Sequence, residues 1–232
     1  MIWCYYLALE PAVRRRWPEM LISWSRLLAG RFSDPLVGRD VLLGGLAGLA
    51  LLATMLLAVP VSARLGSSGE PYLGAADIAG ARLWSCLSAP RHLAHFFFRS
   101  PALCVIYALV AALELYIFQI VLRRPWLARG MLFLVNFLIL LGASENPFVG
   151  AVVGAVFAGI FVTVLVHLGL LSLVATFFVW NVLIRTPLTL DASAWYAGRS
   201  FVILAFFAAL FTAAFYTSLG GKPLFGRALI DD

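Results

Sequence analysis

The stretch NPFVGAVVGAVFAGIFVTVLVHLGLLSLVATFFVWNVLI, residues 146–184, runs for 39 positions without a formally charged side chain. As one helix it would be about 58 Å long, whereas the hydrocarbon core of a bilayer is only about 30 Å thick. The segment must therefore turn back on itself. His167, Leu168 and Gly169 combine a polar ring with a flexible residue, so we predict the turn at 167–169.

The whole composition agrees with a chain whose solvent is largely lipid. Of the 232 residues, 63% are hydrophobic and 12% are charged, whereas a soluble domain is roughly 45–50% apolar and about 25% charged. So few charged side chains could not cover the apolar surface of a soluble domain of this size. The composition excludes a disordered chain, a collagen-like chain and an ordinary soluble domain.

Other uncharged windows extend the pattern of the central stretch, and only Glu114 interrupts one of them. Strands are not expected, because open sheet edges cannot be satisfied in lipid and the alternation typical of a barrel is absent. We predict an all-α polytopic membrane bundle with about six spans, at 41–63, 101–122, 126–144, 148–167, 170–184 and 200–219.

The remaining segments flank this transmembrane domain of residues 41–221. Residues 1–40 are expected to hold the end of a truncated helix and a cytoplasmic juxtamembrane segment, because the short apolar start is followed by three arginines. Within it, 18–28 places Leu21, Trp24, Leu27 and Leu28 on one face and fits an interfacial amphipathic helix. Residues 64–100 are expected to form an external loop and 222–232 a cytoplasmic tail.

The distribution of basic residues predicts the orientation. If the segment before residue 41 is cytoplasmic, the inner segments hold 11 Lys and Arg and the outer segments hold 6. Cytoplasmic loops carry the excess of such residues, so the C-terminus is expected in the cytoplasm. Basic residues at helix ends face lipid headgroups, and we expect no nucleic-acid partner.

Four polar residues inside the predicted spans are candidates for function. Glu114 is the only formal charge well inside a span, where a carboxylate could carry protons or bind a cation, or could simply join two helices. His167 could relay protons with Glu114, or could cap a helix end. Asn136 and Asn181 are expected to form hydrogen bonds between helices.

Cofactor and metal sites are not expected, and neither is catalysis by this chain. The three cysteines are scattered, and the pair His92 and His95 lacks a third ligand. Motifs of hydrolases, nucleotide-binding loops and kinase catalytic loops are missing from the sequence.

Small residues at every fourth position predict close approach of helices. Gly44 and Gly48 form one such stripe, and Gly150, Gly154 and Ala158 form another. Such stripes pack helices within a bundle or in a homodimer.

Several stretches together resemble a known protein region. They are YLALEPAVRRRWP (6–18), LISWSRLLAGRFSDPLVGRDVLLG (21–44), RRPWLA (123–128), PLTLDASAWYAGRS (187–200) and FYTSLGGKPLFG (215–226). This set resembles the C-terminal membrane region of bacterial serine/threonine protein kinases of the PknB-like type, notably acidobacterial ones. In that family a cytoplasmic kinase domain precedes the membrane region, and none of its catalytic motifs lies in this chain.

Two functions follow as expectations. The resemblance implies a membrane-anchoring and signal-sensing module in the bacterial plasma membrane, with a kinase domain in cis as its partner. The alternative is a small transporter or channel subunit that uses Glu114.

Overall fold

The computed structural model describes residues 18–65, 90–144, 146–186, 193 and 197–220, and this part of the chain is helical without strands. The predicted all-α class is therefore confirmed. The elements are α2 (Pro18–Leu28), α3 (Pro35–Arg64), α5 (Pro90–Leu122), α6 (Pro125–Gly142), α7 (Pro147–Thr163), a π-helical turn η1 (Val164–Leu168), α8 (Leu170–Ile184) and α9 (Ala197–Ser218).

Five of the described helices are long and apolar enough to cross a membrane, and they are α3, α5, α6, α7 continued by η1, and α9. The sixth predicted span, 170–184, coincides with α8, which has only 15 residues. At 1.5 Å per residue α8 covers about 22 Å, less than the bilayer core. Most of its side chains are nevertheless buried, because it lies inside the bundle rather than against lipid. The chain is a multi-pass membrane protein.

Proline and a capping side chain set the start of several helices. α3, α6 and α7 each carry proline in the first turn, where its missing N–H costs nothing. The carboxylate of Asp34 accepts from the Leu36 amide, and the side chain of Asn146 accepts from the amides of Phe148 and Val149. α3 consequently begins at Pro35, earlier than the predicted 41.

The second span also begins earlier than predicted. α5 starts at Pro90 and continues through Pro101, so residues 90–100 belong to a helix and not to an external loop of 64–100. The predicted span began at 101 because it was defined as an uncharged window, and Arg99 lies just before that window. Residues 66–89 of that loop, the segment 1–17 and the tail 222–232 lie outside the described residues, as do the side chains of His92 and His95.

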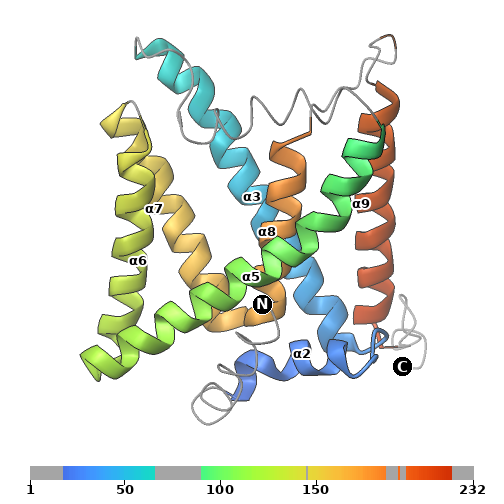
Figure 1. Cartoon of the computed structure of the whole chain (residues 1–232), viewed down its shortest axis with the longest axis horizontal. Helices are drawn as coiled ribbons and strands as arrows, with labels where there is room; N and C mark the ends of the chain where they lie inside the picture. The colour runs from blue at the N-terminus through green and yellow to red at the C-terminus, as the bar shows by residue number, and fades with distance from the viewer. Residues whose placement is uncertain (1–17, 66–89, 145, 187–192, 194–196, 221–232) are drawn as a thin grey trace, which may run out of the picture.

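The membrane helices alternate in direction and share one lower end (Figure 1). α3 and α8 occupy the middle, α5 crosses them obliquely, and α6 and α9 stand at the two sides. At the lower end lie the start of α3, the turn between α5 and α6, η1, and the end of α9. α2 lies across this end, roughly perpendicular to the spans.

Close approach of α3 and α8 holds the centre together. A Cβ added at Gly44 would lie 2.3 Å from the Ser172 carbonyl oxygen, and one at Gly48 would lie 2.7 Å from that of Thr176. The Thr176 hydroxyl donates to the Gly44 carbonyl at 3.0 Å. The first predicted stripe of small residues thus packs two helices of the same chain.

The second stripe faces α6. A Cβ at Gly150 would lie 2.7 Å from that of Ser144, and one at Gly154 would lie 3.3 Å from the Phe137 carbonyl oxygen. Ala158 on the same helix is fully buried. Because α6 of the same chain covers this stripe, the stripe is not an exposed face to which a second copy of the protein could bind.

Candidate functional site

Helix α2 is docked against the bundle. Leu21 and Trp24 are buried, and the helix packs on α3, η1 and α8. Two details differ from the sequence prediction. Leu28 is 53% exposed, because it lies in the last turn beyond the contact. Ser23, which is not among the four residues of the predicted apolar face, is buried. The apolar face of α2 therefore meets protein.

A buried carboxylate explains why Ser23 faces inward. The side chain of Asp40, in the second turn of α3, is 2% exposed. The Ser23 hydroxyl donates to its Oδ2, and Arg39 donates to its Oδ1 from Nε and Nη2 at 3.1 and 3.0 Å. A carboxylate removed from water requires such partners. Sequence reasoning missed Asp40 because the span was begun at the next residue.

The turn between α7 and α8 is the second point of attachment. It lies at Gly169, inside the predicted 167–169, after the chain has widened into η1. Gly169 has φ 93° and ψ −171°, a backbone conformation essentially limited to glycine. A Cβ there would lie 2.8 Å from the carbonyl oxygen of Met20 in α2. Glycine thus lets the α7–α8 turn touch the backbone of α2. π-Helical turns recur at functional positions.

These segments enclose a polar pocket of about 200 Å³ at the lower end of the bundle. Its polar lining comes from Ser23 of α2, Arg39 and Asp40 of α3, and His167 of η1, together with the backbone around Gly169. His167 is exposed and belongs to this pocket. We name it the polar pocket.

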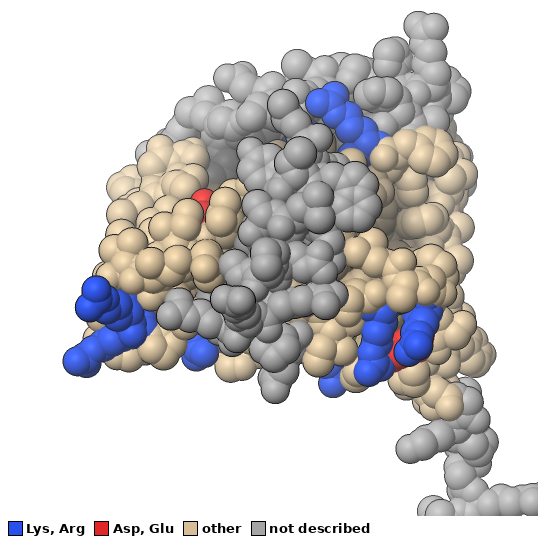
Figure 2. Space-filling model, turned by 60° about the horizontal axis from the view of Figure 1, so that its bottom comes forward, with Lys and Arg blue, Asp and Glu red and all other residues tan. Residues whose placement is uncertain are grey.

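Arginines gather at the same end of the molecule. In Figure 2, which brings that end forward, two groups of basic residues lie at opposite corners of the lower part, one beside acidic residues. The α2–α3 corner carries Arg26, Arg31 and Arg39, and the α5–α6 corner carries Arg123, Arg124 and Arg129. Such a distribution suits a face that meets phosphate headgroups.

Asp34 fastens the turn between α2 and α3. Its hydrogen bond from the Leu36 amide, helped by Arg26 at 2.7 Å and by the charge of Arg31, holds the pKa of this carboxyl below its ordinary value of 3.8. A lowered pKa means that the folded state prefers the ionised form. The resulting stabilisation is present above pH 3.8 and is lost as the pH falls through the lowered pKa.

We therefore expect acid to weaken the attachment of α2 through Asp34. The thermal midpoint of the wild type in detergent should fall between pH 5 and pH 3 by more than that of Asp34→Asn, because the amide has no proton to gain and remains a cap. Equal slopes for both proteins would contradict this role of Asp34.

The remaining intramembrane candidates lie apart from this site. Glu114 is half-buried on α5 and makes no hydrogen bond or ion pair with the described residues. α5 packs chiefly on α6 and α8, whereas η1 packs on α2, α3, α7 and α8. No hydrogen bond or ion pair among the described residues joins Glu114 to His167, and only His167 lines the polar pocket.

The two asparagines make different contacts from those expected. Asn136 donates at 2.9 Å to the Leu132 carbonyl of its own helix, not to another helix. Asn181 is buried, and its side-chain oxygen has no partner among the described residues. The interhelical hydrogen bond in this part of the core comes from Thr176 instead.

The described residues include no group of three or more His, Cys, Asp or Glu side chains placed to hold a metal ion. Comparison of the chain with protein-family models, with curated proteins and with solved structures finds no match. The function is therefore inferred from the contacts of this chain, and among the described residues a group of side-chain hydrogen bonds lies where α2 meets the bundle.

Proposed function

We propose that this chain is a membrane-anchoring and signal-transmitting module of a bacterial receptor-like serine/threonine kinase, with the lower end of the bundle in the cytoplasm. The observation that carries the proposal is the docking of α2. Ser23 binds the buried Asp40 of α3, and Met20 touches Gly169 between α7 and α8. A shift of α3 relative to α7 and α8 would displace α2, which links the bundle to the segment before it.

The cytoplasmic position of this end is supported by its arginines. The lower ends of the helices carry six arginines and the upper regions carry five, which are Arg64, Arg91, Arg99, Arg185 and Arg199. Over the whole sequence, the segments assigned to the lower side hold 11 Lys and Arg against 6. The excess belongs on the cytoplasmic side. In this proposal the protein resides in the bacterial plasma membrane with its C-terminus in the cytoplasm, and a kinase domain in cis supplies the catalysis.

The proposal is tested first by reading the gene upstream of the Met1 codon. We expect an open frame that encodes a glycine-rich loop and the HRD and DFG motifs. The full-length protein in liposomes should then show autophosphorylation that changes about fivefold or more in Gly169→Ala, the lower range of allosteric couplings. Gly130→Ala, in an open stretch of α6, is the matched control and should leave the rate unchanged. A stop codon directly upstream, or equal rates, would refute the proposal.

The transporter hypothesis makes a separate prediction about Glu114. Glu114 lines neither the polar pocket nor the larger groove between α3 and α7. We expect proteoliposomes of the wild type and of Glu114→Gln to show the same proton flux as empty liposomes. A flux that depends on Glu114 would favour the transporter instead.

A further inference from the structure

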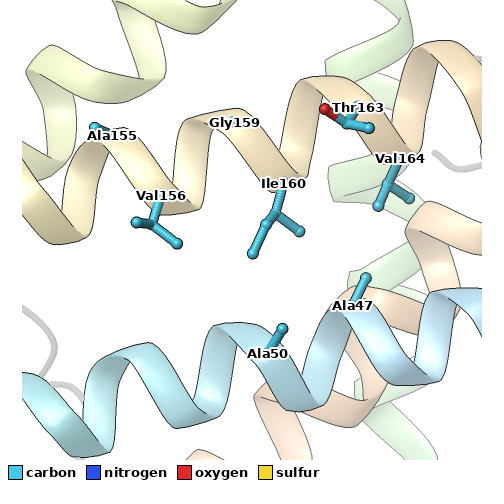
Figure 3. Close-up of a pocket in the computed structure, with 8 residues that line it drawn as sticks. All are labelled: Ala47, Ala50, Ala155, Val156, Gly159, Ile160, Thr163 and Val164. Atoms are coloured by element: carbon cyan, nitrogen blue, oxygen red, sulfur yellow. The ribbon is translucent and has the colours of Figure 1, made fainter.

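A groove of about 450 Å³ lies between α3 and α7. Figure 3 shows Ala47 and Ala50 of α3 facing a row of residues on α7 across an open space. No side chain on either wall is larger than isoleucine, and the α3 wall is formed by two alanines. The groove runs along two spans and is almost entirely apolar, with Thr163 as its one polar side chain.

The groove and the polar pocket share their walls. Asp40 and Ala47 are seven residues apart on α3. Seven residues make about two helical turns, so these two residues lie on the same face of α3, about 10 Å apart. On the opposite wall Val164 lines the groove, and Val166 and His167 line the polar pocket. The apolar cavity is therefore followed by the polar one toward the lower end, along the same pair of elements.

The polar pocket offers hydrogen-bond donors beside the carboxylate of Asp40, which is already bonded to Ser23 and Arg39. Arg39 uses Nε and Nη2 for Asp40 and keeps Nη1 free, and its side chain is 56% exposed. His167 is exposed beside it. The backbone at Gly169, directly before α8, completes this part of the lining. An arginine N–H that has no other partner binds phosphate through a charge-assisted hydrogen bond.

We propose that this pair of cavities binds one glycerophospholipid, with an acyl chain in the groove between α3 and α7 and its phosphate in the polar pocket. The order of the two cavities matches the order of chain and headgroup in a lipid, with the polar part at the end where arginines gather (Figure 2). Arg39 binds the phosphate through Nη1, and His167 donates to another of its oxygens. The bound lipid would bridge α3, α7 and α2, independently of any kinase domain.

Native mass spectrometry of the whole chain in detergent tests this proposal. The probe is palmitoyl-oleoyl phosphatidylglycerol, titrated against palmitoyl-oleoyl glycerol, which has the same chains but no phosphate. Ala50→Leu fills the groove, and Ala53→Leu, which is also exposed on α3 but outside the groove, is its control. Arg39→Gln removes the phosphate ligand, and Arg31→Gln, an exposed arginine outside the polar pocket, is its control.

The wild type is expected to retain one phosphatidylglycerol and to bind the phosphate-free lipid at least about tenfold more weakly, as the loss of one charge-assisted hydrogen bond implies. Ala50→Leu and Arg39→Gln should each weaken retention by about tenfold or more, while both controls match the wild type. Ala50→Leu keeps the test valid even if Arg39→Gln unfolds, because Ala50 lies on the exposed surface of α3. Equal retention in Ala50→Leu and Ala53→Leu, or equal binding of the two lipids, would overturn the proposal.

Discussion

Replacement of Gly44 by alanine is expected to prevent α3 and α8 from packing. The added Cβ would lie 2.3 Å from the Ser172 carbonyl oxygen and 2.8 Å from the Cβ of Ala175. To remove this clash the backbones of α3 and α8 must move apart, because a carbonyl oxygen cannot rotate away as a side chain can. Separation would also break the hydrogen bond from Thr176 to the Gly44 carbonyl. We expect a loss of at least about 3 kcal/mol, the upper range of overpacking costs.

Gly130→Ala is the matched control for this substitution. Gly130 lies in α6 with no atom within 4 Å of an added Cβ, so the same change there should stabilise the protein by about 1 kcal/mol through helix propensity alone. The measurement is the unfolding midpoint of both variants in mixed detergent micelles, followed by circular dichroism. Shifts of the same sign and size in both would show that α3 and α8 do not approach as described.

Gly169→Ala is expected to detach α2 while the spans remain folded. A side chain at φ 93° and ψ −171° is strained, which costs about 1–3 kcal/mol. The new Cβ would also lie 2.8 Å from the Met20 carbonyl oxygen. The readouts are the thermal midpoint and the accessibility of α2 to a protease in intact micelles, both of which should change.

Gly30→Ala separates strain from contact. Gly30 also has a positive φ, 77°, but an added Cβ there has no neighbour within 4 Å. Gly30→Ala should cost only the local backbone strain, about 1–2 kcal/mol. It should leave α2 as resistant to the protease as in the wild type. If Gly30→Ala exposes α2 as much as Gly169→Ala does, the contact with Met20 contributes nothing.

Much of the fold follows from the sequence because lipid limits the choices. Long uncharged windows must be helices, and the stretch 146–184 must turn, so the break at Gly169 and the bounds of α2 and α8 were predictable. The short α8 was predictable in length, but its burial was not, since hydropathy does not distinguish lipid from protein as surroundings.

The site was less predictable, for reasons visible in particular residues. Asp40 stood at the edge of a window defined by absence of charge, and its partner Ser23 comes from a separate segment 17 residues earlier. The stripe at Gly150 and Gly154 indicated close packing without indicating that α6 is the neighbour. Glu114 was conspicuous by its charge, but the densest polar contacts formed elsewhere.

The bundle holds α2 at Asp40 and at Gly169. Hydrogen–deuterium exchange of the intact protein in lipid nanodiscs tests this attachment most directly, by comparing backbone amides of Met20–Leu28 in the wild type and in Gly169→Ala. We expect slow exchange in the wild type and exchange at least about tenfold faster in the variant, as for an element that opens locally. Rapid exchange of α2 in the wild type, at the rate of an unfolded peptide, would contradict the account.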